Sequence, residues 1–268
     1  PYSTTMTRRA AIIWVWGLVL IAGAVGGGYA WWRQQDVTQA YEAGRALADS
    51  QKWEEVLVLA QPYAERDDPR INGLLADAYI NGPDSIRDID KGLTLRRRAA
   101  EAGDMRAAYF MGKWILEHEP TDAQAKEAIG YIQAAADCGL PAANYELGTI
   151  FSSNTYVTRN YNLAIPYLEF AAVSGVSGAA WNAGIVYSRL ASTDPSLMKT
   201  AGPKSMYWLL VSKRKGDADA SRLLVEIQKS IENSAGHEYA RNWFEILEKE
   251  TDQWAKNIRP LAEFNCSK

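Results

Sequence analysis

Histidine and cysteine, the side chains on which most metal sites and much covalent catalysis depend, are scarce in this sequence. The 268 residues contain two histidines, His118 and His237, and two cysteines, Cys138 and Cys266. Their spacing matches no zinc-binding pattern. The phosphate-binding Gly-x-x-x-x-Gly-Lys, the nucleophile motif Gly-x-Ser-x-Gly and the metalloprotease motif His-Glu-x-x-His are absent as well. We therefore expect no enzyme activity, no cofactor, no metal site and no small-molecule substrate. An enzyme with its site in the loops is the least favoured alternative.

An excess of positive charge is also missing. The formal net charge is -3, and such a balance does not favour binding to nucleic acid. Two short basic runs, at 96–98 and 213–215, are interpreted as solvated helix faces, with contact to anionic lipid or an acidic partner as the alternative. His118 lies between Glu117 and Glu119, and we interpret this segment as a solvated loop rather than a metal site.

Two cysteines allow one disulfide bond if the protein resides in an oxidising compartment. Cys138 follows an alanine-rich segment that we expect to be helical. The preferred interpretation is that it is a small packed side chain. Whether it pairs with Cys266 stays open at the level of sequence.

One long stretch, from Ala10 to Trp32, contains no charged residue over 23 positions. As a helix it would be about 35 Å long, which exceeds the hydrocarbon core of a bilayer, about 30 Å. Aromatic residues near its two ends resemble the belts that lie at membrane interfaces, and the tryptophans among them are Trp14, Trp16, Trp31 and Trp32. The stretch predicts a transmembrane helix that also contacts membrane lipid.

A cleaved signal peptide is the competing interpretation of this stretch. Gly28-Tyr-Ala30 is a poor cleavage site, and the apolar run is long for a signal sequence, so we expect an uncleaved anchor. Arg8 and Arg9 precede the run, whereas Arg33 and Arg45 follow it at wider spacing. The positive-inside rule then favours a cytoplasmic N-terminus. In a bacterial cell the remaining chain would lie in the periplasm, anchored in the inner membrane.

Small residues recur at four-residue spacing on the predicted anchor. Such pairs let two membrane helices approach closely, and here they are Gly23 with Gly27 and Ala24 with Gly28. Glycine is common in membrane helices, so a helix partner and no partner are both open.

A ten-residue pattern occurs three times in the rest of the chain, at 103–112, 139–148 and 175–184. Each copy has two successive alanines and an aromatic residue six positions after its first glycine, and each begins and ends with glycine: Gly103, Gly112, Gly139, Gly148, Gly175 and Gly184. The copies are 36 residues apart, a period typical of helical repeat arrays. We expect the opening glycines, and Gly216 after a longer period of 41, to end helices at positive φ. Aromatics at Tyr109, Tyr145 and Trp181 are expected to fill gaps between packed helices.

This pattern resembles the Sel-one-like repeat family, a relative of the tetratricopeptide repeats. The family motif has a helix with Ala-x-x-x-Leu-Gly-x-x-Tyr and a second helix that ends Ala-Ala-x-x-Gly. Residues 143–148 with Phe151, and 171–175, match it well, and residues 107–112 and 135–139 match nearly as well. The glycine-rich loop of the family is missing between Ile115 and Asp122. The resemblance covers 67–216 and implies an α/α superhelix that holds protein partners.

The sequence thus predicts an all-α solenoid preceded by one transmembrane helix. The expected ranges are a short segment at 1–9, the anchor at 10–32, a tetratricopeptide-like hairpin at 33–66, the repeats at 67–216, and stacking and capping helices at 217–268. Within the fourth repeat we expect a loop through Pro195 and Gly202-Pro203. After it we expect a helix whose apolar face is formed by Leu223, Leu224, Val225 and Ile227, and a capping helix over 237–261.

We expect the function of such a chain to be protein–protein interaction. The leading hypothesis is a membrane-anchored scaffold, an accessory or assembly subunit of a membrane protein complex, whose partners are other protein subunits. A transient adaptor or regulator of envelope enzymes or secretion is the alternative.

Overall fold

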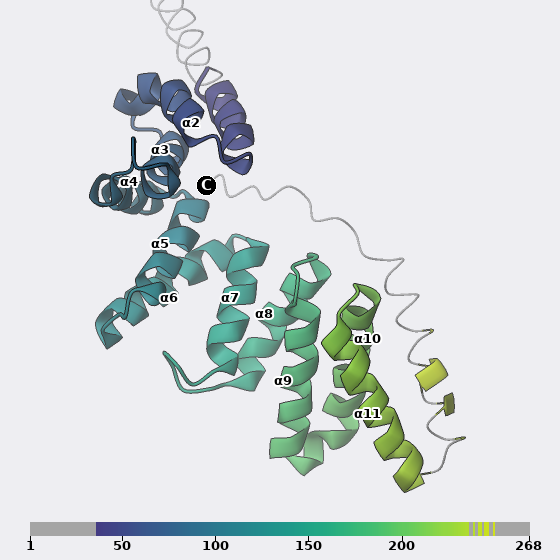
Figure 1. The fold of residues 1–268 in the computed structure, drawn as a ribbon. Helices are drawn as coiled ribbons and strands as arrows, with labels where there is room; N and C mark the ends of the chain where they lie inside the picture. Colours follow the sequence, from purple (N-terminus) through teal and green to yellow (C-terminus); the bar gives the residue numbers. More distant parts are fainter. Residues whose placement is uncertain (1–35, 236–237, 239–240, 243, 247–248, 250–268) are drawn as a thin grey trace, which may run out of the picture. The chain divides into compact units, whose positions relative to one another are not determined.

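The computed structural model describes residues 36–235, 238, 241–242, 244–246 and 249, and the regular elements within these ranges are all helices (Figure 1). The chain divides between Ala102 and Gly103 into two compact units, here called the N-terminal and the C-terminal unit. The predicted anchor at 10–32, its small residues and its tryptophans lie outside these ranges. Within them, no helix is both long and apolar enough to cross a membrane.

The N-terminal unit consists of two helical hairpins. Its elements are a helix over 36–49, α2 (Trp53–Ala60), the 3-10 helix η1 (Gln61–Arg66), α3 (Pro69–Asn81) and α4 (Ile89–Glu101). Asp68 caps α3 by accepting a hydrogen bond from the Arg70 N–H at 2.9 Å, and Pro69 occupies the first helical position, where the missing N–H costs nothing. Val56, Ile71, Leu74 and Leu75 form the centre of the core.

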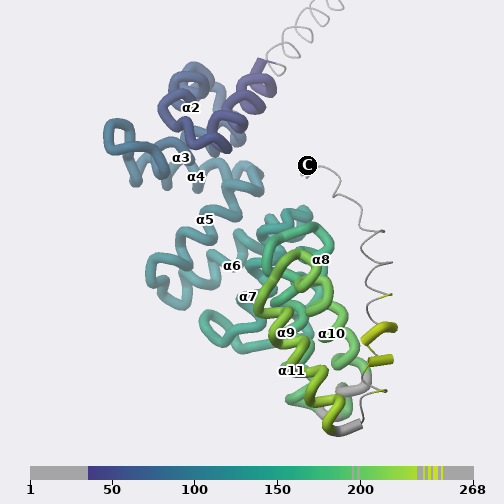
Figure 2. The backbone as a smooth tube through the Cα atoms, turned by 45° about the vertical axis from the view of Figure 1, so that its right-hand side comes forward, coloured from purple at the N-terminus to yellow at the C-terminus, as the bar shows by residue number. Residues whose placement is uncertain are grey.

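The C-terminal unit continues the pattern with three hairpins and a further helix. Its elements are α5 (Met105–Glu117), α6 (Asp122–Asp137), α7 (Pro141–Ser152), α8 (Tyr161–Val173), α9 (Ala179–Thr193), η2 (Pro195–Leu197), α10 (Met198–Arg214) and α11 (Ala218–Ala235). Each helix packs against the next along the chain, and α7 also contacts α9. Figure 2 follows these hairpins in sequence order.

The opening glycines of the repeats end the helices before them. Gly103, Gly139, Gly175 and Gly216 have φ of +96°, +84°, +85° and +89°. A side chain at such φ is strained, so glycine is the residue that lets the chain turn into the next hairpin. The prediction of positive φ at these four positions is confirmed.

The closing glycines have a different role, because each lies where two helices of one hairpin touch. A Cβ built on Gly112 would lie 2.6 Å from Ile132 Cγ1, and one on Gly148 would lie 2.5 Å from Leu168 Cγ. At Gly184 the nearest atom is Leu209 Cγ at 2.8 Å. These distances are shorter than carbon–carbon contact. The repeat therefore pairs a glycine on the first helix with a buried Ile or Leu on the second.

The predicted loop through Gly202-Pro203 is wrong, because both residues lie inside α10. Proline in a helix interior removes one hydrogen bond, but the surrounding contacts hold the segment helical. Ala201 is 3% exposed in the core that Trp208 joins, and the Ser205 hydroxyl donates to the Gly184 carbonyl at 2.8 Å. Tertiary packing thus outweighs the local preference.

The predicted apolar face of the next helix is only partly right. In α11, Leu224 is buried and Leu223 and Ile227 are half-buried, whereas Val225 is 51% exposed. Successive helical residues are about 100° apart, so these four side chains cannot share one face. Among the described residues of the expected capping helix, 241–242 and 244–246 are helical, and Phe244 packs with residues of α10 and α11.

Candidate protein-interaction surfaces

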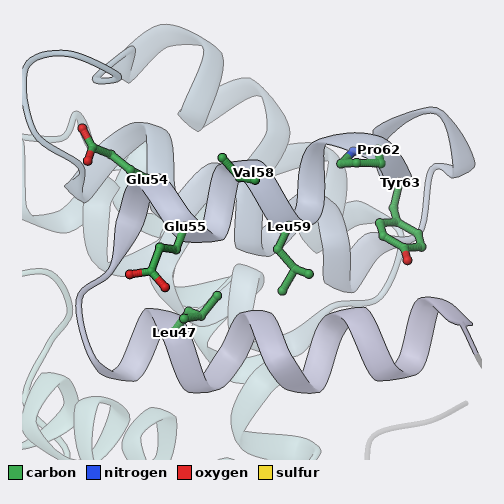
Figure 3. A pocket seen from close by; sticks show the side chains of 7 residues that line it. All are labelled: Leu47, Glu54, Glu55, Val58, Leu59, Pro62 and Tyr63. Carbon is green, nitrogen blue, oxygen red and sulfur yellow. The ribbon is translucent and has the colours of Figure 1, made fainter.

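The N-terminal unit has an open groove of about 630 Å³ between the helix over 36–49 and α2. It is lined by Leu47, Glu54, Glu55, Val58, Leu59, Pro62 and Tyr63 (Figure 3). Val58 is 79% exposed, which is unusual for a β-branched apolar side chain in the middle of a helix. The groove thus presents apolar side chains to solvent.

The composition of α2 explains why apolar side chains remain outside the core. Residues 56–60 are Val-Leu-Val-Leu-Ala, five consecutive apolar residues. Only one side of a helix can face the core, and Val56 and Ala60 occupy it with no exposed surface. Leu59 is half-buried and Val58 points outward. The apolar run at 56–60 thus indicates that α2 carries more apolar surface than its packing on the core requires.

The groove has two different ends, as Figure 3 shows: Glu54 and Glu55 lie at one end of α2, and Pro62 and Tyr63 at the other. The Tyr63 hydroxyl donates to the Asp36 carboxylate at 3.0 Å. This hydrogen bond, together with desolvation, raises the pKa of Tyr63. The contact holds the aromatic ring as a fixed wall.

The acidic end of the groove already makes polar contacts, but they are weak. Lys52 Nζ lies 3.1 Å from a Glu55 carboxylate oxygen, and both side chains are more than half exposed. The Ser85 hydroxyl donates to Glu54 at 2.9 Å. Exposed pairs of this kind contribute about 0–1 kcal/mol. A cation from a partner can therefore compete for these carboxylates at little cost.

A second surface is formed in the C-terminal unit by the first helices of the repeats. The Tyr145 hydroxyl accepts a hydrogen bond from Asn182 Nδ2 of α9 at 3.1 Å. One repeat earlier, burial raises the pKa of Tyr109 to about 12, and the charges of Glu146 and Glu117 add to the shift. Tyr145 thus contacts Asn182, and the charge of Glu146 acts on Tyr109. Asn182 and Glu146 each come directly after the motif aromatic of the next repeat. Tyr109 and Tyr145 thus connect neighbouring repeats, and all three motif aromatics are half-buried.

Glu146 is the one acidic side chain of this surface with a raised pKa. Burial is the main cause, the charge of Glu117 adds to it, and Lys113 opposes it. The carboxylate therefore carries an electrostatic penalty in the folded chain. Lys113 in turn lies 3.5 Å from Glu117.

A cluster of polar side chains joins α8, α9 and α10 and has a structural role. Glu169 Oε1 on α8 accepts hydrogen bonds from the Tyr187 hydroxyl at 2.9 Å and from Trp208 Nε1 at 3.1 Å. Burial and the Glu169 carboxylate raise the pKa of Tyr187. Tyr187 and Trp208 are both 4% exposed and Glu169 is half-buried, so the cluster mainly fixes how the three helices pack.

Arg96, interpreted as part of a solvated basic face, is 5% exposed and forms a salt bridge of 2.8 Å with Asp77 of α3. The prediction is wrong because Arg96 lies on the side of α4 that packs on α3. His118 is exposed at the end of α5, where its ring stacks on Trp114. No group of three His, Cys, Asp or Glu side chains suitable for a metal ion occurs in the part of the chain that the structure describes.

The repeat glycines Gly103 to Gly184 lie at turns and helix contacts rather than on either surface, and the predicted anchor residues lie outside the described ranges. Cys138 is the C-cap residue of α6 and is half-buried. The interaction surfaces themselves consist of side chains that the repeat motif does not specify, apart from its aromatics.

Comparison with known proteins supports the fold. No protein-family model and no curated protein sequence matches the chain. Among solved structures, a Sel1 repeat protein from Oxalobacter formigenes is 22% identical, over 80% of this chain and 87% of that one, with a TM-score of 0.56. A protective antigen of uropathogenic Escherichia coli strains, which displays an SLR fold, is 18% identical with a TM-score of 0.62. That match covers 85% of this chain and 49% of the antigen.

The described part of the chain is therefore an all-α helical solenoid like that of Sel1 repeat (SLR) proteins. The fold implied by the sequence resemblance is confirmed. At these identities the comparison shows the fold alone, so the partner has to be inferred from the surfaces of this chain.

Proposed function

We propose that this protein is a membrane-anchored scaffold that binds other proteins, as an accessory or assembly subunit of a membrane protein complex. The observation that carries the proposal is the groove of the N-terminal unit, which exposes apolar side chains beside two carboxylates. A solenoid fold supports it, because repeat proteins offer extended surfaces for protein partners.

The groove suggests the chemistry of its partner. Val58, Leu59 and Leu47 favour an apolar side chain, and the Tyr63 ring offers a flat wall. Glu54 and Glu55 at the other end favour a lysine or arginine. The partner is thus a protein segment, helical or extended, with apolar residues at one end and a basic residue at the other.

The predicted anchor gives this groove a location. Only residues 33–35 separate the uncharged stretch at 10–32 from residue 36, the first residue described in the helix over 36–49. If the stretch spans the bilayer, the groove lies next to the membrane surface. A juxtamembrane segment of another membrane protein then reaches it without a long linker. We place the chain in the inner membrane of a bacterium with its repeats in the periplasm.

Site-specific photocrosslinking in native membranes tests the groove. A benzoylphenylalanine at Val58 is expected to link the full chain to an apolar segment with a basic residue, identified by mass spectrometry of the linked peptide. The same probe at Thr94, an exposed residue of α4 outside the groove, is the control. Glu55→Lys should abolish the link, whereas Glu65→Lys, the same charge change outside the groove, should not. Equal capture by all four proteins would contradict the proposal.

Membrane attachment is tested separately. The full chain is expected to resist alkaline extraction from membranes, and a variant that lacks 10–32 should be extracted. A C-terminal alkaline phosphatase fusion should be active if the repeats lie in the periplasm. Stoichiometric co-purification of the linked protein favours a fixed subunit, whereas salt-sensitive recovery in small amounts favours the transient adaptor.

A further inference from the structure

Helix α8 carries an apolar stripe on its outer side. Leu163 is 48% exposed, Phe170 38% and Val173 38%, and Pro166 is exposed between them. Their spacing of three, four and three residues places these four side chains on one face of the helix. The Leu163-to-Val173 stripe is the longest row of exposed large apolar side chains on any one helix that the structure describes.

Cys138 lies close to the end of this stripe. Its neighbour Gly139 lies near Phe170, since a Cβ built on Gly139 would be 3.9 Å from Phe170 Cζ. Cys138 is disulfide-bonded, and the described residues contain no free cysteine. The sequence contains a single other cysteine, Cys266, which lies outside the described ranges.

We propose that Cys138 and Cys266 form a disulfide that holds the C-terminal segment 258–266 against the Leu163-to-Val173 stripe of α8. The segment has the composition that the stripe needs. It reads Ile-Arg-Pro-Leu-Ala-Glu-Phe-Asn-Cys, with Ile258, Leu261 and Phe264 as large apolar side chains. It docks on its own chain, so no second protein is needed to cover the stripe.

The reach of the segment agrees with this placement. An extended chain advances about 3.3 Å per residue, so Phe264 lies within roughly 7 Å of Cys266 and Leu261 within roughly 17 Å. Along a helix, the seven residues from Phe170 to Leu163 span about 10 Å. With Cys266 bonded to Cys138, beside Phe170, the two apolar side chains can therefore cover the whole stripe.

Formation of the bond requires an oxidant, and a thiol–disulfide oxidoreductase can supply it. The Cys138 and Cys266 thiols lose two protons and two electrons to the disulfide of a thiol–disulfide oxidoreductase, which becomes a dithiol. Such oxidants operate in the bacterial periplasm, in agreement with the location proposed above. The disulfide closes a loop of more than a hundred residues. In the chain-entropy model, a disulfide stabilises the folded state more as the loop that it closes becomes longer.

Peptide mapping without reductant tests the bond. Trypsin should release residues 127–159 linked to residues 257–268, because cleavage before Pro260 is blocked. Reduction should convert this species into the two separate peptides. Two alkylatable thiols in protein that was isolated without reductant would overturn the proposal, and so would a disulfide-linked dimer of two chains.

Hydroxyl-radical footprinting of the full chain tests the docking. Modification of Leu163 and Phe170 should rise several-fold in Cys266→Ser, and equally in Cys138→Ser. Val225, 51% exposed in the same unit, should be modified alike in all three proteins, which controls for loss of the fold. A linked peptide with unchanged modification of Leu163 and Phe170 would show that the segment is tethered but not docked, and would overturn the second half of the proposal.

Discussion

Replacing Gly112 by alanine should destabilise the α5–α6 hairpin, although alanine is the better helix former. The new Cβ would lie 2.6 Å from the Ala128 carbonyl oxygen and 2.6 Å from Ile132 Cγ1. The first of these atoms belongs to the backbone, and Ile132 has no exposed surface, so neither can move away cheaply. Overpacking of this kind costs about 1–3 kcal/mol. The higher helix propensity of alanine offsets about 1 kcal/mol of this cost. The free energy of unfolding should therefore fall by about 0–2 kcal/mol.

Gly130→Ala is the matched control, since it makes the same substitution on the opposing helix. Gly130 is exposed in α6, and a Cβ there would meet nothing within 4 Å. Only the propensity gain applies, so this variant should be more stable than the parent chain by about 1 kcal/mol. The difference in stability between the two alanine variants isolates the packing term.

Urea unfolding followed by circular dichroism measures this difference. Hydrogen exchange of peptides from α5 and α6 should accompany it, because repeat proteins can unfold in parts. Exchange in the hairpin should be faster for Gly112→Ala and slower for Gly130→Ala. If Gly112→Ala is as stable as Gly130→Ala, the close approach of the two helices is not what requires glycine in the repeat.

Four further substitutions test the electrostatics. Asp77→Ala leaves Arg96 buried without its carboxylate and should cost about 3 kcal/mol, whereas Arg96→Met should cost clearly less in the same thermal-unfolding measurement. Glu146→Gln should stabilise the chain at pH 7. Because the folded-state pKa of Glu146 is raised, the native chain binds more protons than the unfolded one, and the gain should vanish as the pH falls below about 4, the ordinary range of a glutamate. Asp217 has a lowered pKa, chiefly from the Ala220 N–H bond, so Asp217→Ala should cost about 1 kcal/mol at pH 7 and less at a pH below the folded-state pKa, where the protonated carboxyl is the weaker acceptor; pH-dependent urea midpoints check both.

The periodic features of the fold could be predicted from the sequence because they depend on local geometry. A glycine that ends a helix at positive φ, such as Gly139, reflects the backbone of its own turn. The Asp68-Pro69 start of α3 likewise involves neighbouring residues only. The period of 36 then repeats these local solutions, so one correctly interpreted copy predicts the others.

The features that sequence reasoning missed depend on contacts between distant residues. Pro203 lies within a helix because Ala201 and Ser205 are held by α9 and its core, which no local pattern reveals. Arg96 pairs with a carboxylate 19 positions away. The groove at Val58 had a sequence signal, the apolar run at 56–60, but its position between two helices required the structure.

Buried and exposed side chains of this fold have different roles. Gly112 and Ile132, or Gly148 and Leu168, fix how the two helices of a hairpin approach, and they are buried. Changes there alter the fold before they alter any surface. Glu55 and Val58 contribute little to the core, since both are exposed, so they can differ between solenoids without loss of stability. On the proposed function, the choice of partner is set by such exposed, non-repeating side chains. A match in repeat motif therefore identifies the fold, and variants of the groove residues test the proposed partner.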